Sequence, residues 1–445
     1  MEMPTSPYSP PPGVRLREAH AHVAQHGLSL SMVGLESCAS CVEVLERIAE
    51  RCAHTADPMR PVLAGGARPE VWDSDSGGRV WPALVELDRV TGNRPCCAWC
   101  FDYHALMANS AAMRLAGIDE GTADEPGAII GRDVDRSLSG VVYEHAAIRV
   151  WDAVSGGDGL RDRALLMGAV RSLAGHGFGE VHDLKAQRWL GPELSRLDRD
   201  GELEGGLPIT FMLWPLVEDL GAVHDDRSAW ETDRVRLGGG KIFVDGTLNS
   251  RTAWMLHPYV DAEARGQPGK PCGFAMMSPR EIEVAVRRCD GLGVPMAAHA
   301  IGDAAVRAVL AAIETVRPKT PGFRIEHAEL IDEADVGRFA ELGVTCSVQP
   351  CHLLYDIEAL RRAVPDRLDR VLPLRSLIEA GCEPGTGPHG GLIFGSDTPI
   401  VRPAPGDSVQ AAVQRRRVGM GAGEAIGLGE GITEREAWSC FQDRT

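Results

Sequence analysis

The stretch 294-VPMAAHAIGDAAVRAVLAAIETV-316 joins a short apolar run to a longer amphipathic one. Residues 294–299 form an apolar run of strand length that ends on His299. Residues 303–316 repeat their apolar side chains at helical spacing, which places on one helix face Val306, Val309, Leu310 and Ile313. The stretch therefore predicts one buried β-strand followed by one crossover helix.

The same order of strand and helix recurs along most of the chain. Helices such as 279–290 and 332–342 lie between segments of strand type, which are residues 14–22, 179–184, 208–214, 241–245, 294–299, 324–329, 344–349 and 392–397. Eight strands with helical crossovers predict an α/β fold, a (β/α)8 TIM-like barrel. A doubly wound open sheet is the alternative, but no Gly-rich phosphate fingerprint follows any of these strands.

Two segments stand outside this alternation. Residues 1–13 are rich in Pro and Ser and predict a flexible tail, so the barrel domain is expected over 14–445. Residues 54–160 follow strand one and the helix expected at 36–52, and they lack simple periodicity while being rich in Gly, Pro and Trp. A structureless loop of that length is uncommon, which favours an ordered insertion over the active-site face.

Composition narrows the class of protein and of partner. The 445 residues are 44% hydrophobic and 24% charged, which is typical of a globular protein, and the net charge is −17. No Lys/Arg cluster and no long apolar run occurs, which argues against nucleic acid and membranes as partners. The absence of a secretory signal and the 12 scattered cysteines predict a cytoplasmic protein with reduced thiols.

Two Cys-x-x-Cys pairs raise the question of a structural zinc site. Cys38 and Cys41 fall at the start of an amphipathic helix, and Cys97 and Cys100 fall in a strand-like run. A zinc ribbon needs two such pairs folded into one small module. Buried thiols that serve as small hydrophobic side chains are the favoured interpretation.

Polar side chains gather where the predicted barrel strands end. His20 and His22 have the i, i+2 spacing that aims two imidazoles to one side of a strand. The later strands contribute Lys241, His299, His327 and Asp397. Because the ends of barrel strands meet at one mouth, this set predicts a two-metal hydrolytic centre. Carbon dioxide captured on the neutral amine of Lys241 would supply a carbamate that bridges the two ions.

The sequence resembles the amidohydrolase superfamily, and within it the amidohydrolase-3 branch, which includes N-substituted formamide deformylase. The resemblance covers nearly the whole chain from about residue 14. It rests on the stretches Ala19–His22, Lys241–Arg251, His299–Asp303, Arg324–Glu329 with Ser347–Pro350, and Gly395–Pro399, together with Asp102-Tyr103-His104 and Asn109. Three departures stand out, namely Glu18 where the family has Asp, a displaced Pro12-Gly13, and Asn249 in place of Gly.

The resemblance implies a role for each matching residue. His20, His22, Lys241 and Asp397 would hold one metal ion, and the carbamate of Lys241, with His299 and His327, would hold the second. Asp397 would also be the proton shuttle. Substrate-facing positions are implied, with less support, for His104, Asp245 and Arg251. The family's small β-sandwich is expected to be truncated or absent, since few residues precede strand one or follow the last helix.

We therefore expect a cytoplasmic hydrolase that cleaves a C–N bond of an amide-type small molecule by attack of a metal-bound hydroxide. Zinc is the first choice of metal, with Mn, Fe or Co as alternatives. The first alternative function is a mononuclear, deaminase-like hydrolase in which Lys241 carries no carbamate. The second is a degenerate barrel with a binding or regulatory role. The sequence leaves substrate identity and homo-oligomerisation open.

Overall fold

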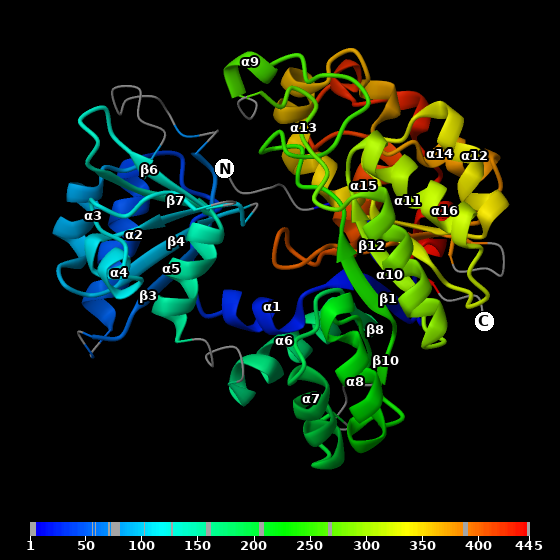
Figure 1. Cartoon of the computed structure of the whole chain (residues 1–445), viewed down its shortest axis with the longest axis horizontal. Coiled ribbons are helices and arrows are strands. Elements are labelled where there is room, and N and C mark those ends of the chain that lie inside the picture. Colours follow the sequence, from blue (N-terminus) through cyan, green and yellow to red (C-terminus); the bar gives the residue numbers. More distant parts are fainter. Residues whose placement is uncertain are drawn as a thin grey trace. The chain divides into compact units, whose positions relative to one another are not determined.

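The computed structural model divides the chain into two compact units (Figure 1). The smaller unit comprises Ala24–Gly168, and the larger comprises Pro4–Val23 together with Ala169–Thr445. The structure describes residues 6–55, 57, 59–69, 72, 81–101, 103–125, 128–156, 162–203, 209–265, 269–385 and 390–442.

The larger unit contains two sheets whose strand pairs are all parallel among the described residues. The four-stranded sheet has the order β1 (Leu16–Ala21), β8 (Phe178–Asp183), β9 (Thr210–Leu213) and β10 (Val235–Leu237). The five-stranded sheet runs in chain order through β11 (Gly240–Phe243), β12 (Met296–Ala300), β13 (Arg324–His327), β14 (Thr345–Val348) and β15 (Leu392–Phe394).

Backbone hydrogen bonds connect the two parallel sheets at both of their edges. At one edge the Asp397 N–H donates to the carbonyl of His20 at 2.7 Å, and the His22 N–H donates to the carbonyl of Thr398 at 2.9 Å. At the other edge the Lys241 N–H donates to the carbonyl of Pro215 at 2.8 Å. The ends of β1 and β15 therefore lie side by side, although their sequences are far apart.

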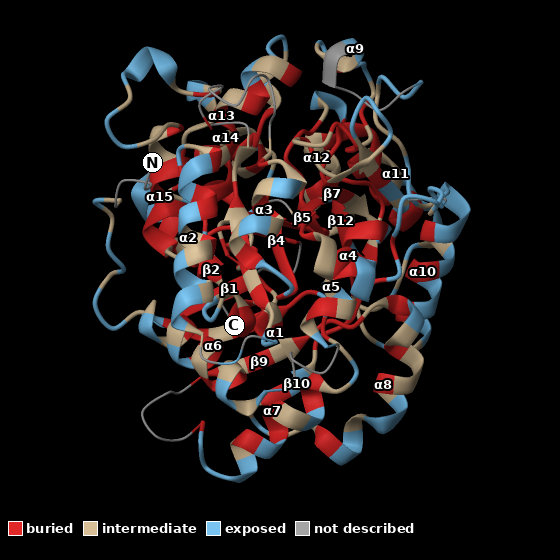
Figure 2. Cartoon of the chain, turned by 90° about the vertical axis from the view of Figure 1, so that its left-hand side faces the viewer, coloured by how far each residue is buried: buried red, intermediate tan, exposed pale blue. Residues whose placement is uncertain are grey.

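Helices alternate with the strands of the larger unit, as parallel pairing requires. α11 (Asp303–Val316) buries the apolar face that its sequence predicts, and Figure 2 shows buried and exposed residues alternating along the helices. Ser278 and Glu281 form a capping box at the start of α10. The other helices of this unit are α7 (Leu190–Arg199), α8 (Val217–Trp230), α9 (Ala262–Arg265), α10 (Pro279–Gly291), α12 (Glu333–Leu342), α13 (Pro350–Ala363), α14 (Leu374–Glu379), α15 (Pro405–Gln414) and α16 (Glu434–Ser439), with short 3₁₀ turns η4 (Leu368–Arg370), η5 (Ala422–Glu424) and η6 (Leu428–Glu430).

The smaller unit has a mixed six-stranded sheet of its own. Its strand order is β2 (Val33–Gly34), β3 (Val62–Ala67), β4 (Cys96–Cys100), β5 (Ala105–Ala108), β7 (Leu138–Glu144) and β6 (Ala128–Arg132), parallel up to β4 and antiparallel beyond it. Its helices are α2 (Cys41–His54), α3 (Leu84–Thr91), α4 (Ser110–Leu115) and α5 (His145–Ser155), while α1 (Val23–Ser29) and α6 (Arg163–Gly175) cross the unit boundaries. The predicted insertion, residues 54–160, falls inside this unit.

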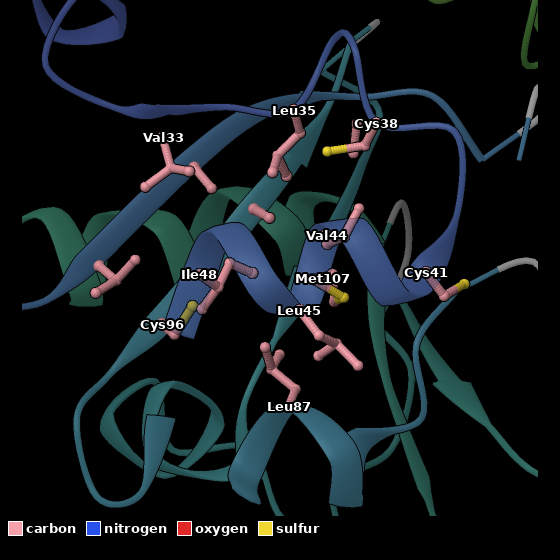
Figure 3. Close-up of a cluster of buried hydrophobic side chains, with 14 of the residues drawn as sticks. Val33, Leu35, Cys38, Cys41, Val44, Leu45, Ile48, Leu87, Cys96 and Met107 are labelled. Atoms are coloured by element: carbon pink, nitrogen blue, oxygen red, sulfur yellow. The ribbon is translucent and has the colours of Figure 1, made fainter. Parts of the chain in front are cut away.

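Buried cysteines belong to the hydrophobic core of the smaller unit (Figure 3). Cys41, Leu45 and Ile48 lie on one face of α2, and Cys38 and Cys96 pack in the same cluster. Cys38 and Cys96 are free thiols. Burial raises the pKa of the Cys96 thiol well above its usual value, which keeps it protonated. These thiols therefore behave as small hydrophobic side chains in this core.

Each of the eight strands predicted from the sequence has an observed counterpart in the larger unit. The short strand β10 is additional, and the helix expected at 36–52 is observed at Cys41–His54. The mixed α/β fold with parallel sheets is thus the one that the alternation predicts. Among the described residues, no helix reaches both the length and the hydropathy that a bilayer crossing requires.

Candidate metal centre

The ends of β1 and β15 bring two imidazoles and one carboxylate together. His20 and His22 flank the last residue of β1, and their ring centroids are 5.6 Å apart. Nε2 of His22 lies 3.0 Å from Oδ1 of Asp397, and Nε2 of His20 lies 3.4 Å from the same oxygen. Three of the predicted metal ligands therefore converge on one point.

Two further histidines come from neighbouring strands of the five-stranded sheet. His299 belongs to β12 and His327 ends β13, and their ring centroids are 4.4 Å apart. The rings of His20 and His327 are separated by 4.8 Å. His327 and Asp397 have positive φ angles, 70° and 63°, which side-chain-bearing residues rarely adopt and which cluster at functional sites. All four predicted histidine ligands thus lie within one cluster.

Lys241 lies in β11 with its ammonium group removed from water. The residue is fully buried, and its Nζ forms no hydrogen bond to any described residue. Nζ lies 5.0 Å from the centroid of the Phe243 ring, which also lies 5.2 Å from the ring of His299. Burial lowers the pKa of Lys241 to about 8, which brings its neutral, nucleophilic amine within reach of ordinary pH.

The charge state of the cluster suits cation binding. Burial lowers the pKa of His20 to about 4 and that of His299 to about 3, so both rings are neutral at pH 7. Burial likewise lowers the pKa of His327 well below its usual value. Burial alone would raise the pKa of Asp397, but His20 and His22 outweigh it and hold that pKa below its usual range. The cluster therefore offers imidazole lone pairs and an anion.

The donor set fits a divalent transition metal. Ligand atoms of His20, His327 and Asp397 all lie within 4.8 Å of one another. Nδ1 of His327 and Nζ of Lys241 are buried and have no hydrogen-bond partner among the described residues. Buried polar atoms without partners are costly, and a metal ion would relieve that cost. Imidazole and carboxylate donors suit zinc and its neighbours in the transition series.

His352 is a member of the cluster that the sequence did not single out as functional. It occupies the first turn of α13, where Nε2 donates to the Ser396 carbonyl at 3.1 Å and lies 4.0 Å from Oδ2 of Asp397. Burial alone would lower its pKa, but the carboxylates of Glu329 and Asp397 raise it to about 9. The signal for it was its position just after a strand of the five-stranded parallel sheet, since β14 ends at Val348.

A second acidic group adjoins His352. Ligand atoms of Glu329, His352 and Asp356 lie within 4.8 Å of one another, with Oε1 of Glu329 3.8 Å from Nδ1 of His352. Asn249, one of the departures from the family pattern, donates to Asp356 at 2.8 Å. A protonated His352 between two carboxylates accounts for this group as an ion-pair network.

Two residues predicted to face the substrate also form buried contacts within the protein. Asp245 is 1% exposed, and its carboxylate accepts the N–H groups of Trp254, Ile301 and Gly302 at 2.8 to 3.0 Å. Burial raises its pKa to about 7. Arg251 is 2% exposed and forms an ion pair with Asp261, at 2.9 Å from Nε to Oδ1. Their contact with substrate stays a prediction.

The third predicted substrate residue, His104, belongs to the smaller unit. Its Nδ1 lies 2.9 Å from Oε1 of Glu144, which itself has a positive φ of 52°. Its neighbour Asp102 lies outside the described residues. The histidine–carboxylate pair is a polar feature of that unit, and its role in binding substrate stays a prediction.

The cluster of predicted ligands falls within the region that a protein-family model matches. The model that describes the amidohydrolase family matches residues 16–443, which is most of the chain and includes every predicted ligand. The chain belongs to the amidohydrolase family. The resemblance inferred from the strand-end motifs is thereby confirmed, including its amidohydrolase-3 branch.

Three curated relatives are each 26% identical to this chain. Protein LONG AFTER FAR-RED 3 of Arabidopsis thaliana matches over 90% of this chain and 68% of its own length. The putative amidohydrolase YtcJ of Bacillus subtilis (strain 168) matches over 90% and 72%, respectively. N-substituted formamide deformylase of Arthrobacter pascens matches over 80% and 65%. The three relatives therefore align with most of this sequence, although about three quarters of the aligned residues differ.

Solved structures of amidohydrolase relatives share the fold. An uncharacterized metal-dependent hydrolase from Pyrococcus horikoshii OT3 has a TM-score of 0.71 at 23% identity, covering 95% of this chain and 78% of that one. A second, from Pyrococcus furiosus, has a TM-score of 0.68 at 25% identity, covering 95% and 79%. The chain is therefore an amidohydrolase-family protein with the fold of metal-dependent hydrolases.

Proposed function

We propose that this amidohydrolase cleaves a C–N bond of an amide-type small molecule at a centre of two divalent metal ions. The observation that carries the proposal is the convergence of the Nε2 atoms of His20 and His22 on Oδ1 of Asp397, beside a buried amine on Lys241. That donor set has no other evident use in a family of hydrolases.

The proposed ligands fall into two groups. His20, His22 and Asp397 would hold one ion, and His299 and His327 the other. Lys241 would lie between the groups as a carbamate, because its buried amine is easily made neutral and lacks a hydrogen bond to any described residue. Zinc fits these donors, and Mn, Fe or Co would fit them as well.

We also propose that the two parallel sheets form one closed (β/α)8 barrel. The hydrogen bonds of Asp397 and His22 at one edge, and of Lys241 at the other, support this closure. In such a barrel the ends of the strands carry the active site, and the proposed ligands other than Lys241, which lies near the start of β11, occupy or follow strand ends. β10 would extend the loop that leads to β11.

When bound, divalent ions lower the pKa of water and polarise a carbonyl oxygen. The protein's own task is to hold the substrate carbonyl and to move a proton. Asp397 is anionic and buried, so it is suited to accept a proton at Oδ2 and to return it to the departing nitrogen. His352 lies 4.0 Å from that oxygen, where its positive charge stabilises the carboxylate.

The test is hydrolysis by metal-loaded protein. Purified full-length protein is stripped with a chelator, reloaded with Zn, Mn or Co, and assayed on N-substituted formamides, N-acyl amino acids and esters. We expect two metal ions per chain and turnover of at least one C–N substrate, with Asp397→Asn losing turnover. One ion per chain with full activity would favour the mononuclear alternative. Metal binding without turnover of any substrate would favour the degenerate barrel.

A further inference from the structure

A fully buried carboxylate contacts the side of His20 that faces away from the metal centre. Oε2 of Glu326 lies 2.7 Å from Nδ1 of His20, and the two residues are 0% and 1% exposed. Glu326 comes from β13, whereas His20 comes from β1, so the contact joins the two parallel sheets. A buried carboxylate at hydrogen-bond distance accepts the proton of the neighbouring ring nitrogen.

Arg324 holds Glu326 in place. The two side chains are two residues apart on β13 and therefore point the same way. The Arg324 guanidinium donates to both carboxylate oxygens, through Nε to Oε1 and through Nη2 to Oε2 at 3.1 Å. A forked pair of this kind restricts the carboxylate to one orientation.

Arg324 is itself fixed by contacts on three other strands. It donates to the carbonyl of Ala19 on β1, to Nδ1 of His182 on β8 at 2.8 Å, and to Oγ of Ser347 on β14 at 2.9 Å. Its guanidinium also lies over the ring of Trp214 at 5.1 Å. Neither Arg324 nor Glu326 can rotate without breaking several buried hydrogen bonds.

The consequence for His20 concerns its tautomer. A neutral imidazole carries one proton, and if Nδ1 donates it to Glu326, Nε2 keeps a free lone pair. Nε2 is the atom that lies 3.4 Å from Oδ1 of Asp397, on the side of the proposed ions. We propose that Glu326, held by Arg324, is a positioning residue that fixes His20 in the Nδ1–H tautomer and aims Nε2 at the metal. The role in metal binding rests on the proposed metal centre, whereas the tautomer of His20 does not depend on it.

One neighbour offers a competing explanation. Nε2 of Gln349 lies 3.3 Å from Nδ1 of His20. Oε1 of Gln349 has no hydrogen-bond partner among the described residues. Amide oxygen and nitrogen are easily interchanged, so a turned Gln349 could accept the same proton. Gln349→Met therefore serves as one control, because it removes this second acceptor and leaves Glu326 in place.

The first measurement needs no metal. Full-length protein labelled with ¹⁵N-histidine is stripped of metal, and long-range nitrogen–proton NMR spectra report which ring nitrogen of His20 carries the proton. The His20 signals are assigned as those missing from a His20→Gln spectrum. We expect the Nδ1–H tautomer in the natural protein and in Gln349→Met. An Nε2–H tautomer in the natural protein would overturn the proposal, whatever the protein's activity.

The second measurement compares metal affinity. Zinc affinity is obtained by competition with a chromophoric chelator for the natural protein, Glu326→Gln and Glu326→Asp. We expect a loss of about 10- to 100-fold in both variants, as is typical when the group that orients a histidine ligand is removed. Asp335→Asn is the matched control, because Asp335 is 2% exposed and pairs with Arg307 and Arg338 away from His20.

Thermal melting separates positioning from simple damage. Asp335→Asn should lower the melting temperature but leave zinc affinity unchanged, whereas the Glu326 variants should lose affinity beyond any loss of melting temperature. Zinc affinity that is unchanged in Glu326→Gln, or that falls equally in Asp335→Asn, would overturn the proposal.

If the natural protein binds no zinc, the proposed function fails, and the tautomer of His20 alone decides the role of Glu326. If both Glu326 variants fail to fold, the same spectrum of the natural protein decides it.

Discussion

Glu18 and Ser396 are separated by 378 residues, yet Oε1 of Glu18 accepts the Ser396 N–H at 2.8 Å. The same oxygen accepts the N–H of His20 at 3.0 Å, and Glu18 is fully buried. Burial raises the pKa of this carboxyl to about 7. One side chain thus clamps the segment that carries His20 to the segment that carries Asp397. Glu18 departs from the Asp expected in the family, and its extra methylene group lengthens the reach of this clamp.

Removing the clamp should weaken the fold and the metal centre together. Glu18→Ala leaves two buried N–H groups without an acceptor, at about 1–3 kcal/mol each, so we expect a loss of roughly 2–6 kcal/mol in the free energy of unfolding. Glu18→Gln keeps an acceptor oxygen and should lose only about 1 kcal/mol. Urea unfolding followed by circular dichroism measures both. Equal stability of the two variants would show that the hydrogen bonds contribute little.

Lys241 should be replaceable in part by a small carboxylate. Lys241→Ala removes the proposed bridge between the two ions. The activity should fall by more than the about 10- to 100-fold that is typical when a group that only orients a metal ligand is removed. Short carboxylic acids such as acetate or propionate should restore part of the turnover by occupying the vacated space. Lys270→Ala is the control, because Lys270 also lies over an aromatic ring, that of Phe274 at 4.0 Å, but is exposed. Lys270→Ala should keep its activity, with or without the added acid. If the acids restore no activity to Lys241→Ala, the result would argue for the mononuclear alternative.

The buried cysteines should not contribute to metal content. Burial raises the pKa of Cys96 well above its usual value and that of Cys97 as well, so neither offers a thiolate for a metal. Cys38→Ala and Cys96→Ala should each lower the free energy of unfolding by about 1 kcal/mol, like the loss of one buried methyl group. Elemental analysis should find the same zinc content as in the natural protein. A lower zinc content in Cys38→Ala would favour the zinc-ribbon interpretation of the pair that Cys38 forms with Cys41.

Acid should weaken one surface ion pair in a defined pH window. Hydrogen bonds from Arg375 lower the pKa of Glu436 from 4.5 to about 2, with contacts of 3.0 and 2.7 Å to its two oxygens. A carboxyl whose pKa is lowered by folding contributes stability above its unfolded pKa, and loses that contribution as the pH falls through the folded value. The stability difference between natural protein and Glu436→Gln, about 1 kcal/mol or less, should therefore be constant near pH 6 and shrink between pH 4.5 and 2.

A double-mutant cycle checks the origin of that pH dependence. In an Arg375→Met background the Glu436→Gln change should have no effect that varies between pH 6 and pH 3, because the partner that lowers the pKa is gone. A pH dependence that persists in that background would assign the effect to Thr433, which also donates to Glu436.

The strands of the larger unit could be predicted from sequence because each is a short apolar run that ends on a polar residue. β12 and α11 lie where the periodicity of residues 294–316 places them. Reading those strand ends was enough to find His20, His299 and Asp397, since parallel strands of this kind end on one side. His352 was missed because it follows its strand by a helical turn rather than ending it.

The sheet of the smaller unit could not be predicted in the same way. β3 reads VLAGGA, β4 reads CCAWC and β5 reads ALMA, so small residues and cysteines replace the β-branched residues that mark a strand. Because these strands are largely buried on both faces, their sequences also lack alternation. Asp245 accepts the N–H of Ile301, 56 residues further along the chain, and spacing in the sequence does not reveal such a contact. Arg251 donates to the nearby carbonyl of Leu248 and pairs with Asp261, contacts that a motif match does not specify.

The hydrogen bond between the Asp397 N–H and the His20 carbonyl has a consequence for synthesis. During translation β1 emerges some 375 residues before the neighbour that completes its edge, which at about 5–20 residues per second is tens of seconds. Contacts of such high sequence separation form late, because the intervening chain must be ordered first. If these residues hold a metal as proposed, the ligand set of His20, His22 and Asp397 is therefore complete only after the segment that carries Asp397 has left the ribosome.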